Sequence, residues 1–210
     1  MKFKLASIIL LLIAFLLVNC TQKENFNLAW TREQAPEYFK AKFETHQGDF
    51  EIEVTRKLSP KAADRFYQLV KHHYFDKGIF YRVVPGFVAQ FGRTDNALIE
   101  QWRAVKIPDE PVVSGNQKGS ISFARAGKET RDVEVFINLE NNTVLDTLQY
   151  EGVRGFPSFG RVTRGMDIVE KLYSGYGEST MNNPNMYTNP EAFYQKFPKL
   201  DLIKKAYIIK

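Results

Sequence analysis

The chain has 210 residues, with 29 lysines and arginines against 24 aspartates and glutamates, and a single cysteine, Cys20. One cysteine cannot form an intrachain disulfide, and three histidines with one thiol supply too few soft ligands for a zinc site. Hydrophobic residues make up 44% of the chain, a share that is typical of globular domains and argues against disorder. We therefore expect a fold held by a hydrophobic core, with no metal and no cofactor.

The first twenty residues have the pattern of an export signal. Lys2 and Lys4 precede an apolar run from Leu5 to Val18, which only Ser7 interrupts. As a helix this run would be roughly 21 Å long, which is shorter than the ~30 Å hydrocarbon core of a bilayer. A basic start followed by a short apolar run is typical of a secretory signal peptide and not of a membrane span.

The end of this run, Leu17-Val18-Asn19-Cys20, resembles a bacterial lipobox, in which the cysteine takes a diacylglyceryl thioether and becomes the mature N-terminus. Asn19 departs from the usual pattern, which has Gly, Ala or Ser there. The alternative is an ordinary signal peptide followed by an incidental cysteine. We expect residues 1–19 to be the signal peptide, Cys20 to be the lipidation site, and the protein to be exported and anchored to a membrane, facing the periplasm. Thr21 lacks the acidic character that some bacteria use for inner-membrane retention, which favours the outer membrane.

The charges of the remaining chain do not indicate a nucleic-acid partner. Removal of residues 1–19 leaves 27 basic residues against 24 acidic ones, a net charge of +3. The basic residues are scattered among acidic ones, whereas nucleic-acid binders usually concentrate them on one face or helix. We therefore expect no nucleic-acid partner.

The rest of the chain divides into a polar tether, residues 20–37, and one strand-rich domain, residues 38–210. Alternating apolar residues on both sides of a turn at 46–49 predict a hairpin over residues 41–54. Ser59-Pro60 is a good helix start, and apolar residues at Phe66, Leu69 and Val70 predict one buried helical face.

Further strands are expected within residues 78–90, where Pro85-Gly86 interrupts the strand pattern, and at residues 119–123, 133–139, 159–162 and 206–209. Short helices are expected at residues 165–172 and 189–197, and residues 177–190 are typical of an irregular loop. Strands from the first part of the domain to the last, with few helices, suggest a closed barrel whose last strand pairs back and removes an edge.

One charged residue is unusual in the strand expected at residues 78–90. Alternation puts Phe80, Arg82 and Val84 on one face, and Tyr81 and Val83 on the other. An arginine that shares a face with two large apolar residues is either exposed or held in a partly apolar cleft for a purpose. The residues alone favour the exposed position.

Residues 80–92, Phe-Tyr-Arg-Val-Val-Pro-Gly-Phe-Val-Ala-Gln-Phe-Gly, closely resemble the signature segment of the cyclophilins, a family of peptidyl-prolyl cis–trans isomerases. Four further segments match family motifs in the expected order, at residues 107–110, 119–127, 134–138 and 159–166. The resemblance covers residues 41–177 and resumes at 205–209. Any one motif is weak, but five in order are specific. The resemblance implies a mainly β fold, a closed eight-stranded antiparallel barrel with two capping helices.

The resemblance also gives Arg82 a purpose. Amide resonance sets a barrier of roughly 18–20 kcal/mol to rotation about an X–Pro bond, so the two isomers interconvert slowly. Twisting the bond localises the lone pair on the prolyl nitrogen, which becomes a better hydrogen-bond acceptor. A guanidinium beside the proline ring then donates more strongly to the twisted bond than to the planar one. This differential binding of the transition state needs no nucleophile, metal or proton transfer.

Other site residues follow from the matched motifs. The family's catalytic set corresponds to Arg82, Phe87, Gln90 and Phe136. In the family, the two phenylalanines line a socket for the proline ring, and the glutamine binds the substrate backbone and helps to orient the arginine. The expected substrate-binding positions are Val88, Ala124, Arg125, Glu134, Leu145 and Phe156.

Three of these positions depart from the family pattern, and one of them is Phe156, which stands in the place of a histidine found in many eukaryotic members. Arg125 replaces a common asparagine and adds charge at the groove, and Glu134 replaces a common glutamine. A carboxylate at position 134 is able to pair with Arg82 or Arg125. Such a pair would slow catalysis if it held Arg82 away from the substrate, and would change little if it only oriented the guanidinium.

Three functions remain open from the sequence. The favoured one is a peptidyl-prolyl isomerase that assists the folding of exported and envelope proteins. The second is a catalytically weak proline-peptide-binding module or chaperone on a lipoprotein anchor, and the third is a structural barrel lipoprotein. The expected partners are proline-containing polypeptides and a membrane, reached through the lipid anchor of a monomeric protein.

Overall fold

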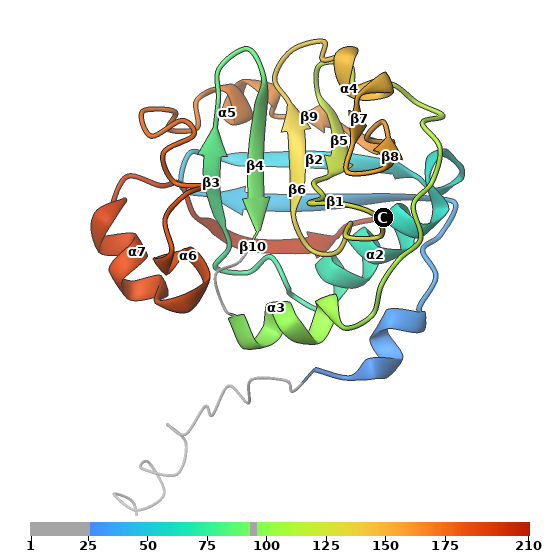
Figure 1. The fold of residues 1–210 in the computed structure, drawn as a ribbon, viewed down its shortest axis with the longest axis horizontal. Helices are drawn as coiled ribbons and strands as arrows, with labels where there is room; N and C mark the ends of the chain where they lie inside the picture. Colours follow the sequence, from blue (N-terminus) through green and yellow to red (C-terminus); the bar gives the residue numbers. More distant parts are fainter. Residues whose placement is uncertain (1–25, 93–95) are drawn as a thin grey trace, which may run out of the picture.

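The computed structural model describes residues 26–92 and 96–210, so the predicted signal peptide and Cys20 lie outside the described residues (Figure 1). Eight strands form one antiparallel sheet: β1 (Tyr38–Thr45), β2 (Asp49–Thr55), β3 (Ile79–Val83), β4 (Val88–Gly92), β5 (Ser120–Phe123), β6 (Val135–Asn138), β9 (Ser158–Arg164) and β10 (Ile203–Ile208). Their order is β10-β1-β2-β9-β5-β6-β4-β3, and the predicted hairpin is the β1–β2 pair.

The sheet closes on itself where β3 meets the start of β10. The backbone N–H of Ile203 donates to the carbonyl of Gly78 at 2.8 Å, and the N–H of Lys77 donates back to Ile203 at 2.9 Å. The N–H of Phe80 donates to the carbonyl of Asp201 at 3.0 Å. These bonds join the two ends of the sheet, so the exposed edges that an open sheet would present are removed. The predicted eight-stranded antiparallel barrel is confirmed.

Two helices cover the barrel at places far apart in Figure 1. Helix α2 (Pro60–Lys71) buries Phe66, Leu69 and Val70, the face that their spacing predicts. Helix α5 (Met166–Glu170) lies beside the β1–β2 turn, where the side chain of Ile168 stands over Gly48.

The remaining elements are short and lie outside the barrel wall. They are the 3-10 helices η1 (Leu28–Arg32) and η2 (Arg56–Leu58), the helices α3 (Asn96–Arg103), α4 (Val144–Thr147), α6 (Asn185–Thr188) and α7 (Pro190–Lys196), and the hairpin of β7 (Gln149–Tyr150) and β8 (Val153–Arg154). Helix α7 matches the prediction, whereas α3 and the hairpin were not predicted. The loop predicted at residues 177–190 contains α6.

The barrel interior is filled largely by aromatic rings. Phe43 stacks on Phe50 with ring centroids 5.0 Å apart, and Phe80 lies 4.9 Å from Phe91. A second apolar cluster forms on the outside of β3, where residues 79 and 81 meet the C-terminal segment, residues 173–200. Its buried members are Ile79, Tyr81, Met186, Phe193, Phe197 and Leu200. This cluster holds the C-terminal segment against β3, next to Arg82.

Part of the predicted tether packs on the barrel. Phe26 lies edge-on to Trp102 with ring centroids 5.2 Å apart, and Trp30 in η1 stacks on His72 at 4.2 Å. Residues 26–37 therefore contribute contacts to the domain predicted at residues 38–210. Of the helices in the described part of the chain, none is long and apolar enough to cross a bilayer.

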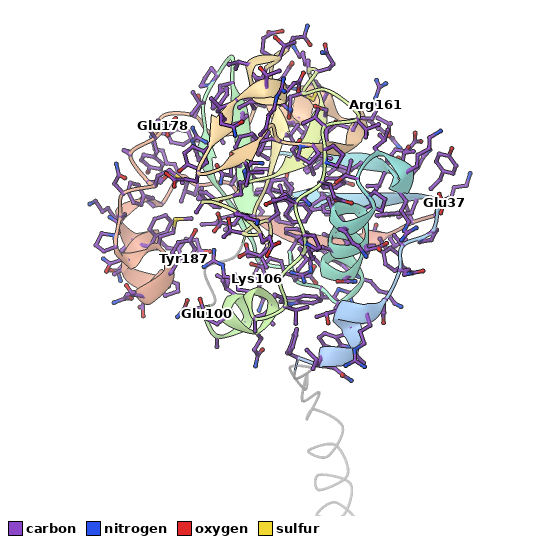
Figure 2. All side chains as sticks on the ribbon, turned by 45° about the vertical axis from the view of Figure 1, so that its right-hand side comes forward. Glu37, Glu100, Lys106, Arg161, Glu178 and Tyr187 are labelled. Atoms are coloured by element: carbon purple, nitrogen blue, oxygen red, sulfur yellow. The ribbon has the colours of Figure 1, made fainter. Side chains whose placement is uncertain are left out.

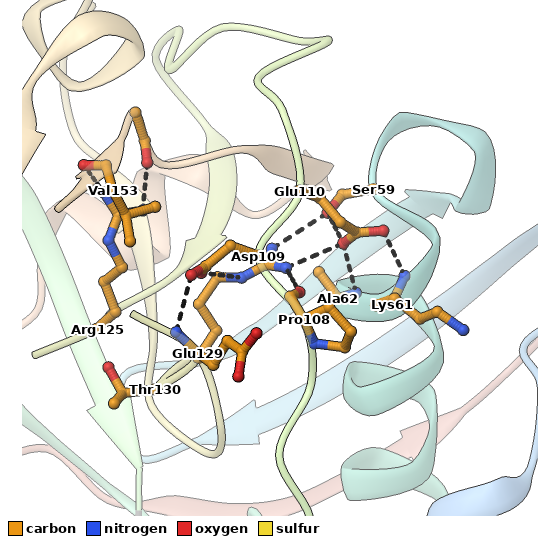
Figure 3. Close-up of polar contacts among 12 residues, drawn as sticks. Ser59, Lys61, Ala62, Pro108, Asp109, Glu110, Arg125, Glu129, Thr130 and Val153 are labelled. Atoms are coloured by element: carbon orange, nitrogen blue, oxygen red, sulfur yellow. Dashed lines mark hydrogen bonds and ion pairs between the residues drawn. The ribbon is translucent and has the colours of Figure 1, made fainter. Parts of the chain in front are cut away.

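The start of α2 is capped by a residue from a distant loop (Figure 3). The Glu110 carboxylate accepts from the backbone N–H groups of Lys61 at 2.8 Å and Ala62 at 3.2 Å, and from the Ser59 hydroxyl. The Ser59 side chain makes no capping bond of its own, although the sequence predicts one. A carboxylate suits this place because the first N–H groups of a helix lack partners and carry partial positive charge.

Buried Arg131 joins that same loop to the core. Its guanidinium donates to the carbonyl of Pro108 and lies 3.2 Å from a Glu110 oxygen and 3.5 Å from an Asp109 oxygen. The residue is only 1% exposed. A buried cation of this kind is tolerated because two carboxylates and the carbonyl of Pro108 surround it.

Candidate active site

Arg82 reaches the outside of the barrel through an irregularity in β3. The pairing of β3 with β4 shifts register between Phe80 and Arg82, which leaves Tyr81 as an extra residue. Phe80 and Val83 both enter the barrel core, whereas Tyr81 packs in the outer cluster. A β-bulge advances the alternation of side chains by one residue. Strict alternation was therefore wrong here, because Arg82 does not share a face with Phe80.

Three of the four expected catalytic side chains form a row across the outer face of three neighbouring strands. Arg82 on β3 stands opposite Gln90 on β4, and Gln90 stands opposite Phe136 on β6. Side chains at opposite positions lie about 4.5–5.5 Å apart at their Cβ atoms, close enough to interact. The Gln90 Oε1 atom accepts a hydrogen bond from Arg82 Nη1 at 3.1 Å. The register of the sheet thus brings together residues 54 positions apart in the chain, from 82 to 136.

An apolar cavity of about 390 Å³ opens beside this row. Its base is a buried cluster of Val88, Phe136 and Leu145, against which Phe87, Ala124 and Phe156 pack. Ligand sites are commonly cavities of this kind, apolar with a few polar groups that fix orientation.

Arg82 is a cation at the rim of this cavity. Its guanidinium lies 5.3 Å from the ring centroid of Phe87, and its side chain is 20% exposed. The cavity therefore combines an apolar socket with an accessible guanidinium that is fixed in place and can donate hydrogen bonds.

Arg125 forms part of the cavity wall, where its guanidinium contacts the Phe156 ring and backbone carbonyls. Its guanidinium lies 4.1 Å from the ring centroid of Phe156 and donates to the carbonyl of Gly155. It also donates to the carbonyl of Val153 at 3.0 Å (Figure 3). Burial lowers the pKa of Arg125. The residue lines the cavity as expected, and these carbonyls and the Phe156 ring hold its guanidinium in place.

Glu134 turns away from the cavity. Its carboxylate accepts from Arg103 Nη2 at 3.2 Å and from the hydroxyl of Tyr187. Burial, with the Glu134 charge nearby, raises the pKa of Tyr187, so the phenol stays protonated and donates. The pairing of Glu134 with Arg82 or Arg125 that the sequence leaves open is therefore corrected, because the C-terminal segment and α3 supply its partners instead.

Four lining residues were not predicted: Leu148, Tyr150, Glu178 and Met181. The first two come from the segment around the β7–β8 hairpin, and the last two come from the C-terminal segment. Leu148, Tyr150 and Met181 are between 38% and 42% exposed, so they form an apolar rim open to solvent. Glu178 forms an ion pair with Arg82. The motifs that predicted the rest of the site do not include these loops, and the sequence offers no other signal for them.

The family model that matches this chain is described as cyclophilin type peptidyl-prolyl cis-trans isomerase/CLD, and the match spans residues 40–189. That range is more than half of the chain and includes every expected catalytic and substrate-binding position. The chain belongs to the cyclophilin family. It is a peptidyl-prolyl cis–trans isomerase by family, and the resemblance of its ordered motifs is confirmed.

Curated relatives and solved structures agree with this assignment. The cyclophilin is 29% identical to a peptidyl-prolyl cis-trans isomerase of Acinetobacter baylyi, over 74% of this chain and 77% of that protein. It is 30% identical to the isomerase CYP18-1 of Arabidopsis thaliana, over 70% of this chain and 96% of that protein. A crystal structure of a Cryptosporidium parvum cyclophilin has the same fold, with a TM-score of 0.58 and 18% identity over 82% of this chain and 98% of that one.

The socket of this cyclophilin should depend on Phe136. Phe136→Ala is expected to weaken the binding of a proline-containing peptide by roughly 10–100-fold, because burial of a phenylalanine-sized surface is worth about 1.5–3 kcal/mol. Titration of the peptide followed by NMR measures the effect. Val144→Ala is the matched control, because Val144 is apolar, 61% exposed and outside the cavity lining. Equal affinities for Phe136→Ala and the unmutated protein would contradict the socket.

Proposed function

We propose that this cyclophilin isomerises X–Pro bonds through Arg82 and assists the folding of exported and envelope proteins. One observation carries the catalytic part of the proposal. Arg82 is a guanidinium at the rim of an apolar cavity, held by Gln90 at 3.1 Å and adjacent to the Phe87 ring. A proline ring seated in that cavity would place its nitrogen near the guanidinium.

The proposed chemistry follows from the donors that Arg82 has available. A guanidinium has five N–H groups; Gln90 engages one and Glu178 two, so two remain. A planar X–Pro amide offers little lone-pair density at nitrogen, and the twisted amide offers much more. A donor fixed beside that nitrogen therefore stabilises the transition state more than either planar isomer, which lowers the barrier.

The proposed substrates are proline-containing polypeptides. One solved Cryptosporidium parvum cyclophilin, with a TM-score of 0.57 and 18% identity to this chain, was crystallised in the presence of the dipeptide Ala-Pro. A cavity of about 390 Å³ with an open apolar rim is large enough for the proline ring and leaves the flanking chain in solvent.

Acceleration of cis–trans exchange in a short X–Pro peptide tests the catalytic proposal. The unmutated protein should shorten the exchange time far below the tens to hundreds of seconds of the free peptide. Ala-Pro dipeptide, added in excess, should slow the catalysed exchange by competition for the cavity. Unchanged exchange at high protein concentration would contradict the proposal.

A weakly catalytic proline-peptide-binding module is the second candidate. The Arg82–Glu178 ion pair is the observation that favours it, because a carboxylate already engages two donors of the guanidinium. This candidate predicts that the peptide binds and that its exchange is not accelerated. The same assay, combined with a peptide titration, therefore separates the two functions.

We further propose that the protein works outside the cytoplasm on a lipid anchor. The support is the sequence: a basic start, a short apolar run and a lipobox-like segment that ends at Cys20. Intact-mass analysis of protein extracted from membranes should show loss of residues 1–19 and addition of a diacylglyceryl group. Cys20→Ser should abolish that mass and release the protein from membranes. A full-length, unmodified chain would contradict the anchor.

A further inference from the structure

Glu178 meets the catalytic guanidinium along one edge. Its Oε2 atom accepts from Arg82 Nε at 3.0 Å, and its Oε1 atom accepts from Arg82 Nη2 at 2.7 Å. This two-pronged geometry fixes both the direction and the plane of the guanidinium, which a single contact cannot do. Gln90 holds the third nitrogen, Nη1, at 3.1 Å. All three guanidinium nitrogens are thus held before any substrate binds.

The fold places Glu178 at this edge through buried contacts. Thr180, which has no exposed surface, donates its hydroxyl to the carbonyl of Tyr81, the residue directly before Arg82. Further along the C-terminal segment, Tyr187 donates to Glu134, and Met186 packs in the outer cluster on β3. Figure 2 shows Glu178 and Tyr187 at separate places along this segment. Surface ion pairs usually contribute little, but this one sits on a segment that Thr180 already anchors to β3 and Tyr187 to Glu134, next to β6.

We propose that Glu178 is a positioning residue for Arg82 in catalysis, an inference that rests on the proposed function. An arginine side chain has several rotatable bonds, and a free one must lose that freedom each time it reaches the transition state. Glu178 and Gln90 remove this freedom in advance and leave two N–H groups for the prolyl nitrogen. The carboxylate acts on the rate through Arg82 and needs no contact with the substrate.

This role predicts a specific split between kcat and KM. Glu178→Ala should lower kcat by about tenfold, since misplaced catalytic groups lose rate steeply, while KM stays within about twofold. The kcat of Glu178→Gln should lie between that of the unmutated protein and that of Glu178→Ala, because the glutamine amide oxygen can still accept one N–H. Glu191→Ala is the matched control, because Glu191 is an exposed carboxylate on α7 that lies outside the cavity lining.

The experiment measures kcat and KM for a proline peptide with these variants, and repeats Glu178→Ala in an Arg82→Lys background. Lysine has no planar fork for the carboxylate to orient, so there Glu178→Ala should change kcat by less than about twofold. An unchanged or raised kcat for Glu178→Ala alone would overturn the positioning role, and so would a loss confined to KM. If the unmutated protein does not accelerate exchange, the proposed function fails as well. If the unmutated protein accelerates exchange and Glu178→Ala has the same kcat, the proposed function stands and the positioning role of Glu178 fails.

Discussion

Arg82→Ala should lower kcat for X–Pro isomerisation by about 10²–10³-fold, the loss that follows removal of one strong transition-state donor. The physical reason is that Arg82 is a cation at the rim of the apolar cavity, and Gln90 and Glu178 hold it there. The proline socket itself does not include the guanidinium, so KM should change much less than kcat. A steady-state assay with a chromogenic proline peptide measures both constants.

Two variants control for that loss. Arg161→Ala removes an exposed arginine on β9, which Figure 2 shows far from Glu178, and it should leave kcat unchanged. Arg82→Lys keeps the charge but loses the planar fork, so its kcat should lie between those of Arg82→Ala and the unmutated protein. Equal kcat values for Arg82→Ala and Arg161→Ala would contradict a catalytic role for Arg82.

Arg131→Met should lower the free energy of unfolding by about 3–5 kcal/mol, the cost of removing one partner from a buried ion pair. Arg131 is 1% exposed and lies 3.2 Å from Glu110, whose carboxylate also caps α2. Methionine fills a similar volume but leaves Glu110 and Asp109 without their buried cation. The loss therefore affects both the loop of residues 108–110 and the start of α2.

Urea unfolding followed by circular dichroism measures this effect, with the midpoint and slope fitted together. Arg161→Met makes the same chemical change on the surface and should alter the unfolding free energy by no more than about 0.5 kcal/mol. A loss below about 1 kcal/mol for Arg131→Met would show that the buried network contributes little to stability.

Much of the barrel follows from local patterns in the sequence. The β1–β2 hairpin and the buried face of α2 follow from spacing alone, because alternation and helical periodicity reflect which residues must be buried. The bulge at Tyr81 does not follow, because it depends on how β3 pairs with β4. Without it, Arg82 is assigned to the wrong face of its strand.

The site was predictable where motifs define it and not where distant loops complete it. Phe87, Gln90 and Phe136 lie in matched motifs, and each lines the cavity as expected. Glu134 lies in a matched motif as well, yet its carboxylate binds Arg103 and Tyr187, because the C-terminal segment reaches it. Glu178 comes from that same segment, 96 residues after Arg82, and no local pattern predicts such a pair.

Two-dimensional exchange spectroscopy on one short X–Pro peptide tests the central claim most directly, with the unmutated protein and Arg82→Ala compared at equal concentration. The claim predicts exchange cross-peaks between the cis and trans resonances with the unmutated protein and their loss with Arg82→Ala. Both proteins should still shift the peptide resonances, because the socket of Val88, Phe136 and Leu145 is intact. Cross-peaks of equal intensity with both proteins, or peptide shifts without cross-peaks for the unmutated protein, would contradict catalysis through Arg82.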